Sequence, residues 1–230
     1  MKTPNWVEAF TEILNRGHES LEWGLPEGWC HAELYRELKM RTEESGWIPF
    51  PDETPYVTCY PEKTTESGTG NKWADLCLHT QAGDAWCWFE LKARKKVKAD
   101  LQDKRAQQAR DALRNDVAAL VGLDVQKTSE LWERSTPASN TYSPNVKEFY
   151  KTVSTGQHYF AAAFLQLGAG PTRKNWDHKV FSDSLEKWLQ QWQKGLQNMS
   201  RPALTIENVT ETTIGEHSLV LYEWLIEPAT

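Results

Sequence analysis

The stretch that most constrains the fold has the pattern of a single β-hairpin. Two runs rich in strand-forming residues, Lys72–Thr80 and Ala85–Ala93, flank the turn-forming sequence QAGD. Opposed residues of an antiparallel pair have numbers with a constant sum, so a two-residue turn at Ala82-Gly83, or a four-residue loop spanning QAGD, places Asp75 opposite Glu90. The sequence therefore predicts two carboxylates that face each other across neighbouring strands.

These opposed carboxylates predict a site for a divalent cation. Side chains opposed on one face of a sheet lie about 5 Å apart at Cβ, and like charges there are destabilising unless they are compensated. Lys92 shares the face of Asp75 and Glu90. Two carboxylates beside a lysine suit a hard cation such as Mg²⁺, which takes oxygen ligands and keeps waters for a phosphate substrate. The alternative is an ordinary charged surface on a half-buried sheet.

The spacing of these residues resembles the PD-(D/E)XK nuclease superfamily, which includes type II restriction enzymes, Holliday-junction resolvases and repair exonucleases. Asp75 and the triad Glu90-Leu91-Lys92 carry the resemblance, which covers about residues 29–120, with Ala74 in place of the motif's proline. The resemblance implies that Asp75, Glu90 and the main-chain carbonyl of Leu91 bind Mg²⁺, with Mn²⁺ as a possible substitute. It further implies that Lys92 orients the attacking water and offsets charge in the transition state.

The resemblance also implies a glutamate on the helix before the first strand that points into the metal site. Leu34 and Leu38 predict a helix over about residues 29–44, because they lie one turn apart. Glu33 and Glu37 lie one turn apart on the same helix and are both candidate catalytic residues. Glu33 is preferred as the metal ligand, and a helix-surface charge is the alternative for each.

The distribution of charge favours a nucleic-acid partner, although the formal net charge is −6. Between Glu90 and Arg114, nine basic residues stand against four acidic ones. A basic segment that begins at the candidate catalytic strand is where a phosphate backbone would lie, whereas acidic surface elsewhere repels non-specific DNA. A solvated helix face is the alternative for part of this segment. The candidate DNA-binding residues are Arg94, Lys95, Lys96, Lys98, Lys104 and Arg105.

The remaining patterns predict an α/β fold, a three-layer α/β/α sandwich with a mixed central sheet and a restriction-endonuclease-like core. A strand at 158–167 is expected to run parallel to the hairpin, and a strand at 56–60 is expected to be the first core strand. Residues 122–156 read as irregular, with a loop at 135–140 and a helical turn at 146–150. Further helices are expected at 5–14, 101–120 and 182–196, and further strands at 47–50 and 218–225.

Length and composition predict one globular domain over residues 1–230. The expected core spans about 29–170, with an N-terminal helix and a C-terminal helix-strand elaboration. No apolar run approaches the roughly 20 residues that span a bilayer, and no signal-peptide core follows the N-terminus, so a cytoplasmic location without a membrane partner is expected. The four cysteines (30, 59, 77 and 87) lack metal-ligand spacing and are expected to be reduced core thiols.

Together these features predict an Mg²⁺-dependent phosphodiesterase that acts on DNA. A deoxyribonuclease of restriction or defence type, an endonuclease, is the leading interpretation. The alternatives are a DNA repair or junction-resolving nuclease and a catalytically silent domain of the same fold that binds nucleic acid or protein. A homodimer is compatible with either class.

Overall fold

The computed structural model describes residues 3–17, 26–50, 53–58, 70–95, 102–135, 149–167, 183, 187 and 208–226. Its helices are α1 (Trp6–Arg16), α2 (Pro26–Met40), α3 (Thr42–Ser45), α4 (Gln102–Val121), α5 (Val125–Ser135) and the short 3₁₀ helix η3 (Thr152–Ser154). Its strands are β1 (Trp47–Pro49), β2 (Thr54–Thr58), β3 (Gly70–Ala74), β4 (Leu76–Thr80), β5 (Ala85–Lys95), β6 (Gln157–Leu167), β7 (Asn208–Ile214) and β8 (His217–Ile226).

Six strands form one mixed sheet in the order β1-β4-β5-β6-β8-β7, and β2 pairs with β3 in a separate two-stranded sheet. The pairing of β5 with β6 is parallel, whereas the other pairs are antiparallel. The fold is therefore mixed α/β with a mixed central sheet, as the sequence predicted.

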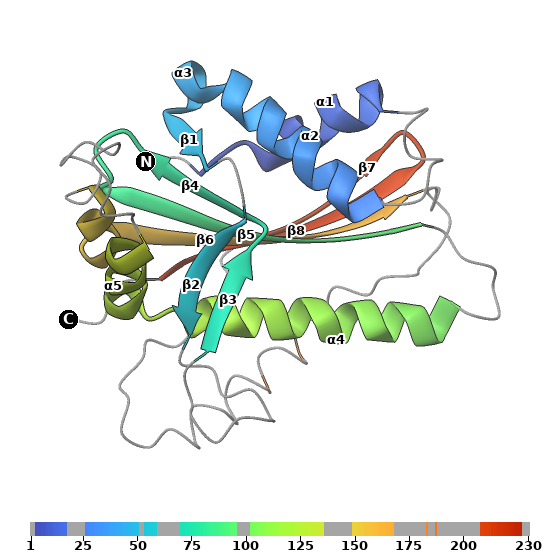
Figure 1. The fold of residues 1–230 in the computed structure, drawn as a ribbon. Helices are drawn as coiled ribbons and strands as arrows, with labels where there is room; N and C mark the ends of the chain where they lie inside the picture. Colours follow the sequence, from blue (N-terminus) through green and yellow to red (C-terminus); the bar gives the residue numbers. More distant parts are fainter. Residues whose placement is uncertain are drawn as a thin grey trace.

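Alternating side chains of β5 supply apolar surface to both faces of the sheet. Phe89 and Leu91 belong to a buried cluster with residues of α1 and α2, whereas Trp86 and Trp88 belong to a second cluster with residues of α4 and α5. Helices α1 and α2 accordingly lie above the sheet and α4 below it in the view of Figure 1. Helices thus bring side chains to both faces of β5.

The hairpin register predicted from the sequence is confirmed. Leu76 pairs with Phe89 and His79 with Trp86, which is the register that places Asp75 opposite Glu90. The connection is the four-residue loop, with the N–H of Gly83 donating to the carbonyl of Thr80 at 3.0 Å. Gly83 has a φ of +71°, a left-handed conformation that glycine adopts without steric cost.

The first arm of the hairpin is not one continuous strand, because the chain bends at Asp75. Residues before the bend form β3 and pair with β2, and residues after it form β4 between β1 and β5. The expectation that 56–60 forms the first core strand is therefore wrong. Strand β2 instead forms a ribbon with β3 that crosses in front of the main sheet in Figure 1.

Most other predicted elements are confirmed, with two omissions. The predictions at 5–14, 101–120, 47–50, 158–167 and 218–225 correspond to α1, α4, β1, β6 and β8, and β6 is parallel to β5 as expected. The reading of 122–156 as irregular missed α5, and the edge strand β7 was not predicted. The loop at 135–140 and the helix at 182–196 fall largely outside the described residues.

The expectation of reduced core thiols agrees with the described part of the chain. Cys30, Cys77 and Cys87 are buried free thiols, and burial raises the pKa of the Cys30 thiol to about 12. Cys59 lies outside the described residues. Among the described helices, none combines the length and apolarity that crossing a membrane requires.

Candidate active site

Strand β5 extends past the start of its neighbour β4, and this leaves one of its edges open. β4 begins at Leu76, opposite Phe89, whereas β5 continues to Lys95. In an extended strand the N–H and C=O groups of every second residue point to the same edge. Polar backbone groups on this edge beyond Phe89 therefore need partners other than β4.

Two carboxylates bind the backbone of this open edge. Asp75 Oδ2 accepts a hydrogen bond from the N–H of Leu91 at 2.6 Å, and Glu27 Oε2 accepts one from the N–H of Ala93 at 3.4 Å. Asp75 comes from the bend before β4, and Glu27 from the first turn of α2. The carbonyl of Leu91 points to the same edge as its N–H, and hence toward these two acids.

Glu90 places a third carboxylate beside Asp75. Its side chain is buried, with 4% of the residue exposed. Burial is the main cause of a pKa well above the ordinary value, and the charges of Asp75 and Asp116 add to it. Burial also raises the pKa of Asp75, although the charge of Lys92 and the bond from Leu91 partly oppose this rise. Asp75 and Glu90, which the sequence predicted to be opposed, are therefore close enough for the charge of Asp75 to disfavour ionisation of Glu90.

Lys92 lies at the centre of the cluster. Its Nζ atom is 2.9 Å from Asp116 Oδ2 and 3.3 Å from Glu27 Oε1. Burial of Lys92 disfavours its charged form, but the acids Asp116, Asp75 and Glu27 outweigh burial and raise the pKa of the ammonium group above its ordinary value. Lys92 is therefore a fixed positive charge among four carboxylates.

The glutamate of α2 that contacts this site is Glu27, which sequence reasoning missed. Helix α2 begins at Pro26, whereas the sequence suggested a start near residue 29. At 1.5 Å per residue, Glu33 and Glu37 lie about 9 and 15 Å along the helix from Glu27. Among the described residues, the contacts of Glu33 and Glu37 are with arginines. A metal-ligand role for either therefore stays a prediction, whereas Glu27 contacts β5 beside Asp75.

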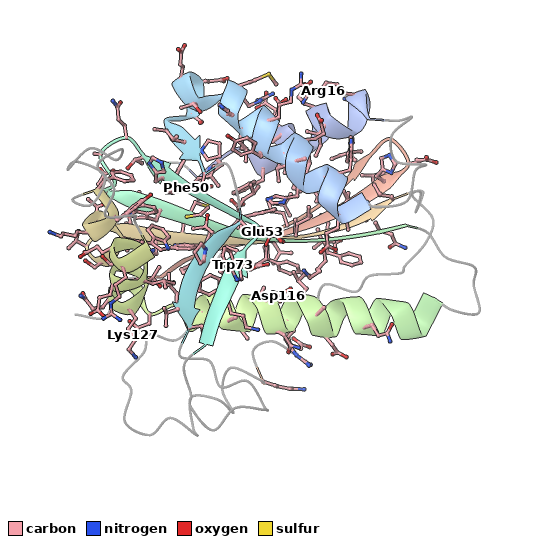
Figure 2. All side chains as sticks on the ribbon, viewed as in Figure 1. Arg16, Phe50, Glu53, Trp73, Asp116 and Lys127 are labelled. Carbon is pink, nitrogen blue, oxygen red and sulfur yellow. The ribbon has the colours of Figure 1, made fainter. Side chains whose placement is uncertain are left out.

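Glu37 contacts two arginines instead. It is buried and forms ion pairs with Arg16 and with Arg41, the second at 2.6 Å. Burial opposes its ionisation, but the hydrogen bond from Arg41 and the charges of both arginines prevail and lower the pKa of Glu37. Glu33 lies 4.0 Å from Arg36 on the same helix. Both glutamates thus have roles away from the site, and Figure 2 shows Arg16 on the outer side of the helical layer.

Sequence reasoning also missed Asp116, which approaches from α4 on the other face of the sheet. Figure 2 shows this residue on the side of α4 nearer to the sheet. The signal was present in the sequence, since Asp116 interrupts the buried stripe formed by Leu113, Val117 and Leu120. An acid on an apolar stripe requires a buried partner, and Lys92 is that partner here.

The predicted DNA-binding residues are only partly covered by the structure. Arg94 and Lys95 are the last residues of β5, so they follow the open edge directly. Lys104 and Arg105 belong to the first turn of α4. Lys96 and Lys98 lie outside the described residues. The basic segment therefore begins where the acidic cluster ends, and its contacts with DNA stay a prediction.

The donor set suits a hard divalent cation in its chemistry. Within the described ranges, no three His, Cys, Asp or Glu side chains stand close enough together to enclose a metal ion. Two of the four acids are instead turned toward Lys92. Carboxylate and carbonyl oxygens are the ligands that Mg²⁺ prefers. Burial and the neighbouring acids disfavour the ionised form of Glu90, and burial disfavours that of Asp75. A bound cation would stabilise the ionised forms of both acids.

Comparisons of the chain with protein-family models, with curated proteins and with solved structures gave no match. Function must therefore be inferred from the residues around the open edge of β5.

Proposed function

We propose that this protein is a metal-dependent nuclease that hydrolyses DNA phosphodiester bonds. The observation that carries the proposal is the convergence of Asp75, Glu90 and Lys92 at the open edge of β5, in the register predicted from the hairpin. A mixed sheet with helices on both faces is compatible with the three-layer α/β/α core of the PD-(D/E)XK superfamily. Glu27 supplies the helix-borne glutamate that the resemblance implies.

Each residue of the cluster has a role in this proposal. Asp75, Glu90, Glu27 and the carbonyl of Leu91 would hold Mg²⁺, or Mn²⁺ in its place. The bound ion would supply a Lewis acid for the scissile phosphate and a water of lowered pKa. Lys92 would orient that water and offset negative charge that develops on the phosphate during attack. The hydrogen bonds from Leu91 and Ala93 keep two of the carboxylates fixed against β5.

DNA is the proposed polymer because a basic segment continues from the site. Binding to a polyanion draws on Lys and Arg, and nine such residues lie between Glu90 and Arg114. An endonuclease of restriction or defence type is the leading assignment, and a repair or junction-resolving nuclease is a second form of the same chemistry. The cytoplasmic location and a homodimer stay predictions.

A catalytically silent binding domain is the competing class, and the ion pairs of Lys92 favour it. Glu27 and Asp116 both pair with the ammonium group of Lys92. In the described part of the chain, the acids do not enclose a position for a metal ion. In such a domain the cluster would serve stability, and the chain would bind a polymer without cutting it.

A cleavage assay separates these possibilities. The wild-type protein is incubated with supercoiled plasmid, single-stranded DNA and RNA, each with Mg²⁺, with Mn²⁺ or with EDTA. We expect cleavage of DNA with either metal and none with EDTA. Discrete fragments would indicate a sequence-specific enzyme, and a smear would indicate an unspecific nuclease. Binding without cleavage under every metal condition would support the silent domain and contradict the proposal.

Substitutions along α2 test which glutamate belongs to the site. Glu27→Gln is expected to reduce cleavage at least about 100-fold, since a metal ligand contributes several kcal/mol to the transition state. Glu37→Gln is expected to keep the cleavage rate but to lower the free energy of unfolding by about 1–3 kcal/mol, because charged hydrogen bonds are lost. Initial rates on plasmid DNA and urea unfolding provide the two measurements.

Glu33→Gln is the matched control on the same helix. Among the described residues its carboxylate makes the long contact with Arg36, so both rate and stability should stay near wild type, the stability within about 0.5 kcal/mol. A loss of cleavage in Glu33→Gln or Glu37→Gln, at a temperature where the variant is folded, would contradict the assignment of Glu27. It would indicate that the substituted glutamate belongs to the site.

A further inference from the structure

The ammonium group of Lys92 is held between acids from two helices that pack on opposite faces of the sheet. Glu27 reaches it from α2 and Asp116 from α4. The Lys92 side chain is 14% exposed, less than either acid, so this contact lies at the inner part of the cluster. The bridge therefore joins three separate elements at one nitrogen atom.

The two acids are not equivalent in their surroundings. Glu27 also accepts the N–H of Ala93 at the open edge, beside Asp75, where the proposed metal would bind. Asp116 comes from the opposite face and lies closer to the ammonium group, at 2.9 Å against 3.3 Å. If Glu27 becomes a metal ligand, Asp116 is the acid that stays with Lys92.

A lysine needs such a partner to act from a defined position. Its side chain has four rotatable bonds, and fixing them costs up to about 2 kcal/mol of rotamer entropy. Because the ammonium group is a point charge without a preferred bonding plane, a fixed acid must supply the direction. An ion pair from the rigid 20-residue helix α4 supplies it.

We propose that Asp116 is the positioning residue that holds the Lys92 ammonium group at the reaction centre, while Glu27 is free to bind metal. This inference rests on the proposed nuclease function and assigns a role to an acid outside the Asp75, Glu90, Lys92 motif. Asp116 acts through Lys92 and touches neither substrate nor metal.

A double-mutant cycle tests this role in single-turnover cleavage assays with excess enzyme. Asp116→Asn should lower the maximal rate about 10–100-fold, by analogy with the loss seen when residues that orient metal ligands are replaced. The half-saturating concentrations of DNA and Mg²⁺ should change less than about two-fold. In a Lys92→Ala background Asp116→Asn should have no further effect, because the residue that it positions is gone. Asp116→Glu should recover part of the rate, since it restores the charge.

Asp111→Asn is the matched control, because Asp111 lies on the same helix and pairs with Arg114 at 3.3 Å. It should cleave like wild type. A further loss from Asp116→Asn in the Lys92→Ala background, or a weakened Mg²⁺ dependence, would identify Asp116 as a metal ligand and overturn the inference. An unchanged rate in Asp116→Asn would overturn it as well.

The metal-free protein gives a readout that does not depend on cleavage. The side-chain ammonium resonance of Lys92, assigned by its loss in Lys92→Ala, should be observable by NMR in wild type and in Glu27→Gln, because the ion pair with Asp116 slows exchange with water. It should vanish in Asp116→Asn. Persistence of the resonance in Asp116→Asn would contradict the inference. If the wild type cuts no polymer, the proposed function fails, and the resonance still decides whether Asp116 fixes Lys92.

Discussion

Replacing Asp75 with asparagine or Glu90 with glutamine is expected to lower Mg²⁺-dependent cleavage about 10³-fold or more while the protein stays folded. A catalytic metal contributes several kcal/mol of transition-state stabilisation, and each 1.36 kcal/mol corresponds to about a tenfold change in rate. The amides keep the shape of the acids, and the amide oxygen introduced by Asp75→Asn can still accept the hydrogen bond from Leu91. What these changes remove is the negative charge that would attract the ion.

Stability should respond in the opposite direction from activity. Burial and the neighbouring Asp75 disfavour the ionised form of Glu90, and a neutral amide removes the cost of keeping this carboxyl group protonated above its ordinary pKa. Both variants should therefore melt at or above the wild-type temperature, as measured by circular dichroism. Glu216→Gln, in the exposed turn between β7 and β8, is the control that should change neither property. Cutting at the wild-type rate by either amide variant would remove that residue from the mechanism.

The second large effect concerns the free energy of unfolding. Without metal it is expected to fall as pH rises, and Mg²⁺ is expected to oppose this fall. Burial raises the pKa of Glu90 well above its ordinary value of 4.5, so the folded protein keeps a proton that the unfolded chain releases above this pH. The unfolded state then binds fewer protons, and the free energy of unfolding falls as pH rises, by up to about 1.4 kcal/mol per pH unit. The raised pKa of Asp75 acts in the same sense.

Mg²⁺ binds the ionised acids, so its stabilising effect should grow as pH rises. At a concentration 100 times its dissociation constant, a ligand stabilises the folded state by about 2.7 kcal/mol. Urea unfolding in EDTA and in Mg²⁺ between about pH 6.5 and 7.5 measures both effects, below the range in which unfolded cysteines ionise while the buried thiols of Cys30, Cys77 and Cys87 stay protonated. This range avoids His158, whose burial lowers its pKa to about 4 and whose contribution to stability changes only between about pH 4 and 6.5.

Glu90→Gln is the control for this second prediction. The variant should lose most of the decline in stability with pH and most of the response to Mg²⁺, since both depend on the same carboxyl group. A decline as steep in Glu90→Gln as in wild type would assign it to another titrating group and would contradict the proposed origin.

The hairpin could be predicted from sequence because its determinants are local. Strand-forming runs on both sides of a glycine-containing turn fix the register, and the register alone brings Asp75 opposite Glu90. The parallel strand β6 was predictable for a similar reason, since a continuous apolar run of strand length requires burial on both faces. These elements needed no knowledge of what packs against them.

Glu27 could not be assigned because its position depends on where α2 begins and on what that end meets. Gly24, Pro26 and Gly28 weaken the helical pattern before residue 29, yet proline is favoured at the first position of a helix. The first turn of α2 carries an acid and packs against the open edge of β5. This is a tertiary contact, and patterns in the local sequence do not predict it.

The missed elements α5 and β7 have their own physical reasons. Asp124 caps α5 by accepting the N–H of Lys127 at 3.0 Å, a signal that went unrecognised among polar neighbours. Strand β7 lies at the outer edge of the sheet with only β8 beside it, and Val209 on it is 39% exposed. An edge strand buries little apolar surface, so its sequence carries only a weak pattern.

The acidic cluster around Lys92 draws on residues between Glu27 and Asp116, and β5 at its centre is paired with the parallel strand β6 from beyond residue 156. Contacts between residues so distant in sequence form slowly, because long loops must close before the pairing stabilises them. The cluster therefore assembles only after the chain as far as β6 has reached its final topology. Nascent or truncated chains that lack β6 would carry the acids without the strand that supports β5, so the aligned cluster would appear late in folding.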